Sequence, residues 1–124
     1  MIIGIGTDII QIHRISESIE KYGTRFLNRI YTETEINYSS GFKEAQALHF
    51  AARFAAKEAF SKAIGTGITE GFKFKEIGIK NEINGKPEVE LFGLLLERWG
   101  NYKTHISLSH TNRDAIAFCV IEIQ

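Results

Sequence analysis

Residues 43–64 read KEAQALHFAARFAAKEAFSKAI and contain the longest helical pattern in the chain. Eight of these residues are alanine. So many small side chains on one helix indicate that neighbouring backbones approach it closely. Gly65-Thr66-Gly67 then ends the helix, because glycine adopts the left-handed conformation of a helix C-cap without steric cost. We expect this long helix to lie at the centre of the fold.

The residues before this helix predict one strand followed by short helices. Residues 2–7 place isoleucine beside glycine and indicate a short strand that ends at Asp8. Apolar residues then recur at helical spacing, and Gly23 is the expected break between two helical pieces. Thr32, followed three residues later by Glu35, is typical of a capping box at the start of another short helix. The apolar positions of the first two pieces are Ile15, Ile19, Tyr22 and Phe26.

The residues after the long helix predict a β-hairpin and a short helix. Apolar residues alternate with polar ones at 77–79 and again at 89–91. Between these two strands, Asn84-Gly85 favours a type I′ turn. Residues 94–99 are expected to form the short helix.

The C-terminal residues predict a second hairpin. Its strands are expected at 105–109 and 115–123, around a turn at 111–114. The last strand is apolar on both faces, so it needs cover on both sides. We therefore expect a single α+β domain over residues 1–124, with antiparallel β-hairpins, one long central helix and several short helices.

The composition excludes several classes of protein. Of the 124 residues, 44% are hydrophobic and 24% charged, and Lys plus Arg equals Asp plus Glu at 15 each. A net charge of zero argues against attachment to nucleic acid by bulk charge. No apolar run approaches the roughly 20 residues of a membrane-spanning helix, and the N-terminus has no signal-peptide pattern. We expect a cytoplasmic protein with neither nucleic acid nor membrane as a partner.

Several common catalytic motifs are absent. The two glycines at positions 4 and 6 lack the rest of a dinucleotide fingerprint, and no P-loop or H-E-x-x-H pair occurs. Ser109 and His110 are neighbours on a predicted strand, so they point to opposite faces and cannot work together. Cys119 is the single cysteine, and its apolar strand indicates a packed thiol in a reducing compartment.

A site for a hard cation remains. Glu58 and Lys62 lie four residues apart, hence on one face of the long helix. Asp8 lies where the first strand is expected to end. Magnesium is commonly held by one or two carboxylates together with substrate phosphates. The alternatives are an exposed Glu58–Lys62 ion pair and an N-cap role for Asp8, and the residues alone leave both open.

Two further polar stretches can be interpreted either as structural or as functional. Lys86-Pro87 follows Asn84-Gly85 and is most simply the exit of a hairpin turn. His105 and Ser107 share one face of a predicted strand, and that face either meets solvent or lines a ligand cleft.

Four segments carry a more specific pattern, namely Gly4 to Ile9, Arg53 to Ile68, Asn84 to Pro87 and His105 to His110. Together they resemble the holo-[acyl-carrier-protein] synthase family, the small bacterial class of 4′-phosphopantetheinyl transferases. The resemblance runs in order over the whole chain. It implies the fold of that family and transfer of 4′-phosphopantetheine from coenzyme A to a serine of apo acyl carrier protein. It also implies that adenosine 3′,5′-bisphosphate is released and that the product serves fatty acid biosynthesis.

The resemblance also implies the roles of individual residues. Asp8 and Glu58 are expected to bind Mg²⁺ together with the coenzyme A pyrophosphate, and Lys62 to contact the phosphates. These three residues form the expected catalytic set. Either Glu58 or a metal-bound water could take the proton of the carrier serine, and our hypothesis is Glu58, acting directly or through water. The other expected contacts to coenzyme A are Arg53, Gly65, Asn84, Gly85, Lys86, Pro87 and His105.

The resemblance further implies a protein partner and an assembly. Family members are homotrimers with active sites at subunit interfaces, so Asp8 need not meet Glu58 of its own chain. The acidic carrier protein is expected to dock on the first helices, where basic residues flank an apolar stripe. The docking residues are expected to be Arg14, Lys21, Arg25, Phe26 and Arg29.

Two other functions stay open on the sequence. A non-catalytic coenzyme A or nucleotide-binding module would use the same fold but would have less need of a metal-polarised pyrophosphate. A magnesium-dependent phosphohydrolase would need an activated water and no carrier protein. The basic first helix favours a protein acceptor over water.

Overall fold

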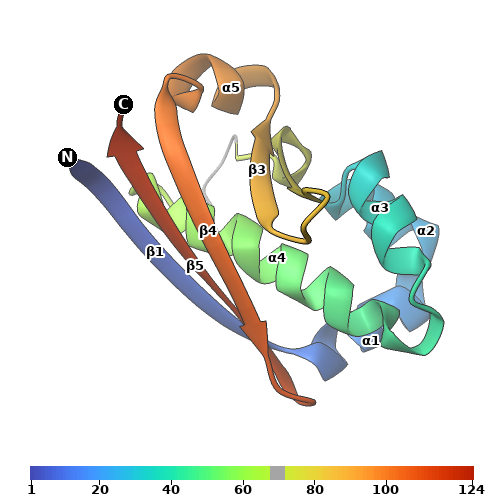
Figure 1. The fold of residues 1–124 in the computed structure, drawn as a ribbon. Coiled ribbons are helices and arrows are strands. Elements are labelled where there is room, and N and C mark those ends of the chain that lie inside the picture. Colours follow the sequence, from blue (N-terminus) through green and yellow to red (C-terminus); the bar gives the residue numbers. More distant parts are fainter. Residues whose placement is uncertain (68–71) are drawn as a thin grey trace.

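The computed structural model describes residues 1–67 and 72–124 (Figure 1). Ile68, the last residue of the longest family segment, lies outside these ranges. The helices and strands in chain order are β1 (Ile2–Gln11), α1 (Ile12–Tyr22), α2 (Thr24–Ile30), α3 (Glu33–Ser40), η1 (Lys43–Ala45), α4 (Gln46–Ala63), η2 (Phe74–Glu76), β2 (Ile77–Asn81), β3 (Pro87–Leu91), α5 (Gly93–Trp99), β4 (Tyr102–His110) and β5 (Asp114–Ile123).

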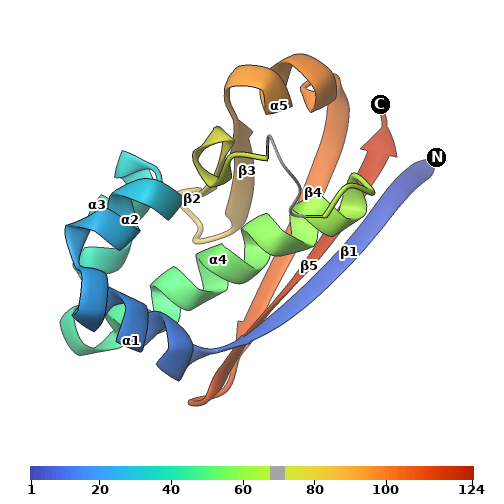
Figure 2. The same ribbon diagram turned by 180° about the vertical axis from the view of Figure 1, so that it is seen from behind.

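Two antiparallel sheets surround the long helix. The larger has the strand order β1-β5-β4, and the smaller pairs β2 with β3. Figures 1 and 2 show α4 lying along one face of the larger sheet, with α1, α2 and α3 grouped beside one half of α4. The predicted α+β class and the central helix are confirmed. In the described ranges, no helix has the length and hydropathy needed to cross a membrane.

Glycine and alanine let β1 approach α4 closely. A Cβ atom on Gly4 would lie 1.9 Å from the carbonyl oxygen of Ala63, and one on Gly6 would lie 1.9 Å from that of Ala59. Both distances are far below van der Waals contact, so a side chain at either position would push the helix away. This close approach brings the next inward-facing residue of β1, Asp8, against α4.

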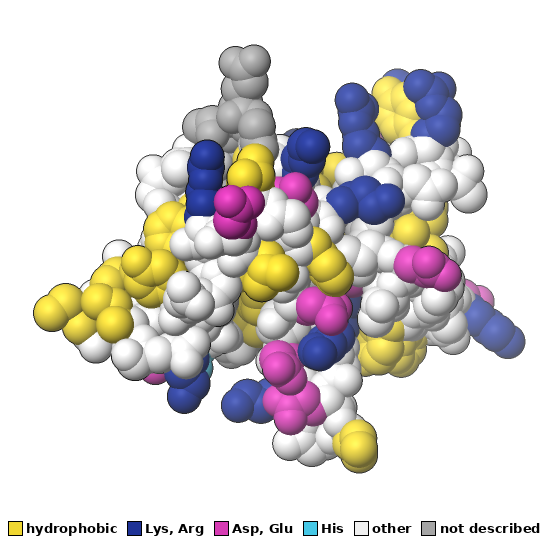
Figure 3. Space-filling model, turned by 90° about the horizontal axis from the view of Figure 1, so that it is seen from above, with side chains coloured by type: hydrophobic (Ala, Val, Ile, Leu, Met, Phe, Trp, Pro, Cys, Tyr) yellow, Lys and Arg dark blue, Asp and Glu magenta, His cyan; other side chains and the backbone are white. Residues whose placement is uncertain are grey.

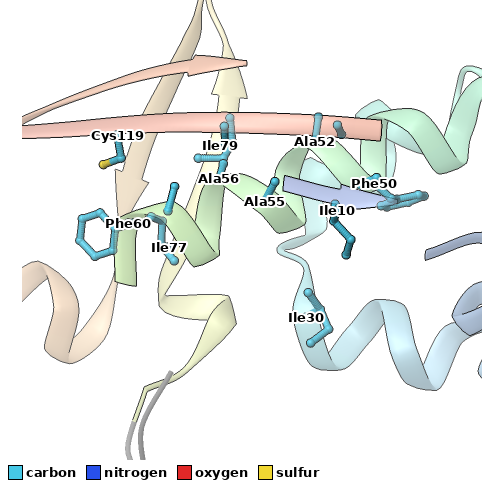
Figure 4. Close-up of a cluster of buried hydrophobic side chains, with 14 of the residues drawn as sticks. Ile10, Ile30, Phe50, Ala52, Ala55, Ala56, Phe60, Ile77, Ile79 and Cys119 are labelled. Atoms are coloured by element: carbon cyan, nitrogen blue, oxygen red, sulfur yellow. The ribbon is translucent and has the colours of Figure 1, made fainter. Parts of the chain in front are cut away.

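The core lies between α4 and the two sheets (Figure 4). Ala55, Ala59 and Phe60 of α4 are fully buried, and Ile77 of β2 is buried with them. Cys119 is also fully buried, and burial raises the pKa of its thiol to about 12. The prediction of a packed, unreactive cysteine is confirmed.

Several predicted boundaries are corrected. Strand β1 continues to Gln11, which is itself the residue before α1, so Asp8 is not an N-cap. The α-helical part of the long helix begins at Gln46, after the short η1 turn. The break at Gly23 is confirmed, and the capping box of Thr32 and Glu35 forms both of its hydrogen bonds.

The turn between β2 and β3 is longer than predicted. A type I′ turn needs positive φ at both central residues, whereas Gly85 has φ +87° and Asn84 does not share that conformation. Instead, the N–H of Gly85 donates to the carbonyl of Glu82, and the N–H of Glu82 donates to that of Lys86. Residues 82–86 thus close the hairpin, with the glycine in the left-handed position.

Only one face of β5 is covered within the chain. Ala117 and Ile121 point toward α4 and are fully buried, whereas Ile116 and Phe118 on the outer face are 40% and 47% exposed. We expected both faces of β5 to be covered, and this chain covers one of them.

Candidate functional site

Asp8 and Lys62 meet across the contact between β1 and α4. The Nζ atom of Lys62 lies 3.2 Å from Oδ1 of Asp8 and donates to the carbonyl of Thr7 at 3.0 Å. The Asp8 side chain is only 15% exposed. Lys62 thus forms its ion pair with Asp8 on the strand. The alternative of an exposed Glu58–Lys62 ion pair is wrong.

Glu58 shares this region with Asp8. Burial raises the pKa of Glu58, and the charge of Asp8 raises it further, while Lys62 and Arg14 oppose the rise. A neighbouring carboxylate has this effect only at short range, because like charges disfavour ionisation. Asp8 therefore meets the glutamate of its own chain, which answers a question that the sequence left open.

A cavity of about 250 Å³ opens beside the two carboxylates. We call it the acidic pocket. Arg14 contributes a positive charge to its rim, and Phe26 and Phe54 form an apolar wall. The residues that line it are Asp8, Ile9, Ile10, Arg14, Ile15, Ser18, Phe26, Phe54 and Glu58.

A second cavity, of about 410 Å³, lies against the β2–β3 turn. We call it the turn pocket. It contains four of the predicted coenzyme A contacts, namely Arg53, Gly85, Lys86 and Pro87. Residues from α3, α4 and β4 complete it, so the turn pocket collects segments that are far apart in the sequence.

Arg53 is held rigidly in the wall of the turn pocket. Its side chain is only 2% exposed, and burial lowers the pKa of its guanidinium. One terminal nitrogen donates to Oδ1 of Asn81, and the guanidinium lies 4.5 Å from the ring centre of Tyr38. Its Nε has no hydrogen-bond partner in the described residues. Arg53 therefore brings a fixed positive charge to the wall of this pocket, which favours an anion there.

Three predicted contact residues lie apart from both pockets. His105 is on the outer face of β4, where its Nε2 lies 2.7 Å from Oε1 of Glu122. Asn84 accepts the backbone N–H of Lys86, so it shapes the turn without lining the turn pocket. Gly65 follows the end of α4 with φ +89° and has open space around it. Within one chain, none of the three lines the turn pocket with Arg53.

Several residues of the turn pocket were not predicted from the sequence. Asn81 holds Arg53 and also donates from Nδ2 to the carbonyl of Gly85 at 2.9 Å. Tyr38 and His49 line the same cavity. The one available signal was Arg53 itself, since an arginine among alanines in a central helix requires polar partners. Nothing in the spacing identifies which residues those partners are.

A third hollow extends along α1 and α2. It measures about 660 Å³, and we call it the basic groove. Among the predicted docking residues, Arg25, Phe26 and Arg29 line it, whereas Arg14 lines the acidic pocket. Lys21 instead lies over the ring of Tyr22, with 5.4 Å between Nζ and the ring centre. Figure 3 shows Lys and Arg side chains around an apolar one where α1 and α2 lie.

The basic groove and the acidic pocket are adjacent. Ser18 and Phe26 line both. A partner seated on the basic helices therefore lies close to Asp8 and Glu58.

A sequence profile described as the 4′-phosphopantetheinyl transferase superfamily matches residues 4–119. The chain belongs to this superfamily. Among relatives of this transferase, the holo-[acyl-carrier-protein] synthase of Protochlamydia amoebophila is 48% identical over 97% of this chain and 98% of its own. The protein of that name from Wolbachia pipientis of Culex pipiens is 46% identical over the full length of both chains.

Solved structures of the superfamily have the same fold. A holo-(acyl-carrier-protein) synthase of Bacillus anthracis, in complex with CoA (3′,5′-ADP), is 38% identical and superposes with a TM-score of 0.86 over 100% of this chain and 99% of its own. The Helicobacter pylori enzyme in complex with coenzyme A is 31% identical, with a TM-score of 0.82 over 95% and 99%. The predicted family and fold are confirmed.

Proposed function

We propose that this transferase moves 4′-phosphopantetheine from coenzyme A to a serine of apo acyl carrier protein, in support of fatty acid biosynthesis. Its relatives bear the name of that reaction. The observation that carries the proposal is the acidic pocket, which Asp8 and Glu58 line, with Lys62 paired to Asp8 and the basic groove adjacent. Such an arrangement suits a phosphoryl acceptor that arrives as part of a protein.

The donor set at the acidic pocket fits magnesium. Among the described residues no group of three or more His, Cys, Asp or Glu side chains could hold a metal by itself. Asp8 and Glu58 are two carboxylates, and Mg²⁺ usually takes one or two from the protein and the rest from phosphates and water. When bound, the ion would neutralise charge on the pyrophosphate and orient it.

The chain's own residues supply positioning and charge. Phosphoryl transfer needs little covalent help from the protein, so catalysis rests on alignment and electrostatics. Lys62, already fixed by Asp8 and the carbonyl of Thr7, places a positive charge beside the pocket. Its role is to offset negative charge on the leaving adenosine 3′,5′-bisphosphate.

Glu58 is the proposed general base. The carrier serine hydroxyl must lose its proton as its oxygen forms a bond to phosphorus and the bond to the leaving bisphosphate breaks. In the metal-free protein the pKa of the Glu58 carboxyl is raised, which makes it a better proton acceptor than an ordinary glutamate. The proton passes to its carboxylate, directly or through one water.

The turn pocket is the proposed site of the nucleotide portion of coenzyme A. Arg53 and Lys86 bring two cationic side chains to it, and Gly85 and Pro87 give it a narrow backbone wall. The Bacillus anthracis and Helicobacter pylori relatives were solved with coenzyme A or its nucleotide. Arg53 is the proposed partner of a phosphate group of that nucleotide.

A homotrimer would complete the site. The outer face of the large sheet exposes Ile5, Ile9, Ile116 and Phe118, from 40% to 63% each. Contiguous apolar surface of this kind is typical of subunit interfaces. His105 lies on the same face, opposite Val120, so association through that face would carry His105 and its neighbours to a second subunit. We therefore assign His105 to a contact with coenzyme A across the interface.

The deciding experiment is the intact mass of several apo acyl carrier proteins after incubation with this chain, coenzyme A and Mg²⁺. We expect a gain of one phosphopantetheine that is lost with a chelator or with Asp8→Ala. Saturable coenzyme A binding without any gain in mass would indicate a binding module. Breakdown of coenzyme A without modified carrier would indicate a phosphohydrolase.

A further inference from the structure

Lys57 and Glu35 form an ion pair in the interior of the molecule. Their Nζ and Oε1 atoms lie 2.7 Å apart, and both side chains are 0% exposed. Lys57 precedes Glu58 in the chain, yet it is buried in the core and has no part in the reaction described above. Buried pairs of this kind are costly to desolvate, so they often serve a purpose other than stability.

The lysine has no donor left for a ligand. Besides Glu35, its ammonium donates to the carbonyl of Phe74 at 2.9 Å and to that of Ile77 at 2.6 Å. An ammonium group has three N–H donors, and these three acceptors use all of them. Lys57 is therefore fixed in place by protein groups alone.

The glutamate is equally occupied. Its Oε2 accepts the backbone N–H of Ile79 at 2.8 Å, and its Oε1 accepts that of Thr32 at 2.9 Å. Glu35 and Lys57 together thus bind β2 at two backbone positions, the carbonyl of Ile77 and the N–H of Ile79. In the described part of the chain β2 has only β3 as a strand partner. Because a two-stranded ribbon is marginal by itself, these bonds fix its position against α4.

Strand β2 also contains Asn81, the residue that holds two parts of the turn pocket together. Asn81, two residues after Ile79, accepts from the guanidinium of Arg53 and donates to the carbonyl of Gly85. Arg53 lies four residues before Lys57, hence one turn earlier on α4. Two bridges therefore run side by side from α4 to β2, one through Lys57 and one through Arg53.

We propose that Glu35 and Lys57 are positioning residues that set the placement of β2 on α4 and so hold Arg53 and the β2–β3 turn in the geometry that binds the nucleotide of coenzyme A. This inference rests on the proposed function of the turn pocket. A pair that served stability alone would affect unfolding but would not affect nucleotide affinity selectively.

The test is Lys57→Met, which keeps the length of the side chain and removes its donors. We expect the KM for coenzyme A to rise about tenfold or more, with kcat and the KM for the carrier protein within about threefold of the parent. The Kd for adenosine 3′,5′-bisphosphate, measured by calorimetry, should rise by the same factor as the KM. Amide exchange at Ile79 should also become faster, because its strand loses its support.

A matched control separates positioning from stability. Ile121→Ala opens a cavity in β5 and is expected to lower the melting temperature without a bond to β2. Equal loss of nucleotide affinity in Lys57→Met and Ile121→Ala, or no loss in either, overturns the proposal. If Lys57→Met does not fold, Glu35→Gln takes its place, because it keeps the volume and one carbonyl acceptor. Unchanged nucleotide affinity in Glu35→Gln then overturns the proposal.

The calorimetric measurement also separates this inference from the proposed function. If the parent chain binds the bisphosphate but modifies no carrier protein, the transferase proposal fails and the variants still decide the role of the pair. If the parent chain does not bind the bisphosphate, the turn pocket is not a nucleotide site, and the inference fails with it.

Discussion

At Glu58, the local environment raises the pKa of one carboxyl group. Burial and the adjacent Asp8 both raise its pKa, although Lys62 and Arg14 are close enough to oppose them. In the proposed reaction, this arrangement keeps a destabilised carboxylate where the serine proton is accepted. It also predicts that the residue costs stability while it supports catalysis.

Glu58→Gln tests the catalytic part of this argument. The amide keeps the shape of the side chain but cannot accept the proton, so we expect kcat to fall by about 10²- to 10⁴-fold. Coenzyme A binding, measured by calorimetry with Mg²⁺ present, should survive. Equal loss of binding and turnover would instead show that Glu58 acts only as a ligand.

The pH dependence of stability tests the electrostatic part. In metal-free protein, the raised pKa means that the folded state holds the Glu58 proton more tightly than the unfolded state does. Stability is therefore lost as pH rises from the ordinary glutamate pKa through the raised one, and the cost persists above it. The urea midpoint of Glu58→Gln should exceed that of the parent by more at about pH 7 than at about pH 4. A gap that does not change with pH would contradict this assignment.

At the scale of elements, the close contact of β1 with α4 is what brings Asp8 to Glu58 and Lys62. Gly4 and Gly6 have no side chain between the strand and the helix, and the facing helix positions are alanines. Asp8 follows Gly6 on the same face of β1, so the backbone separation sets its distance from the helix.

Gly6→Ala should disturb both stability and the site. The added Cβ would lie 1.9 Å from the carbonyl of Ala59, and we expect a loss of about 3 kcal/mol in the free energy of unfolding. Mg²⁺-dependent activity should fall with it, because Asp8 moves away from Glu58. Gly41→Ala is the control, since its Cβ would approach no closer than 3.4 Å to another atom. Denaturant unfolding and turnover of both variants check the prediction.

The basic groove on α1 and α2 predicts how the carrier protein is recognised. Charge at the rim of an interface mainly guides the first encounter of the two proteins. Reversal of that charge therefore weakens the binding of an acidic partner selectively. For Arg25→Glu we expect the KM for the carrier to rise about tenfold while the KM for coenzyme A is unchanged. Arg98→Glu reverses an exposed arginine on α5 and should leave both constants unchanged. A similar effect in the two variants would show a response to net charge alone.

At the scale of the whole molecule, the chain leaves its large sheet half covered. Helix α4 covers one face, and the other exposes Phe118 at 47% and Ile9 at 63%. Small domains often complete their apolar burial by association. This uncovered face is the surface through which we propose that the chains associate as a trimer.

Phe118→Asp tests the trimer directly. A charge in the centre of an apolar interface is strongly unfavourable, so light scattering should show the mass falling from that of a trimer to that of a monomer. Coenzyme A affinity should fall as well, because the contacts across the interface are lost. Ile83→Asp places the same charge at the fully exposed turn between β2 and β3 and should keep the trimer. An unchanged mass for Phe118→Asp would refute association through this face.

The sequence by itself determined the family, the α+β class and the long helix, and it nominated Asp8, Glu58 and Lys62 as site residues. These features depend on local pattern: alanine spacing, the glycines at positions 4 and 6, and motifs of neighbouring residues. Hydrophobic periodicity and capping signals act over one turn or one strand, so they can be read without knowledge of the fold.

Only the tertiary structure decided which charges meet and which surfaces remain open. Lys62 bonds to Asp8, which is 54 residues away, and not to Glu58 on its own helix. Local sequence patterns also did not predict three other features: Asn81 as the partner of Arg53, the longer turn at 82–86, and the exposed face of β5. The physical reason is that contacts between residues far apart in the sequence depend on how the helices and strands pack. Many residues along the chain could form an ion pair or hydrogen bond with the same charged group.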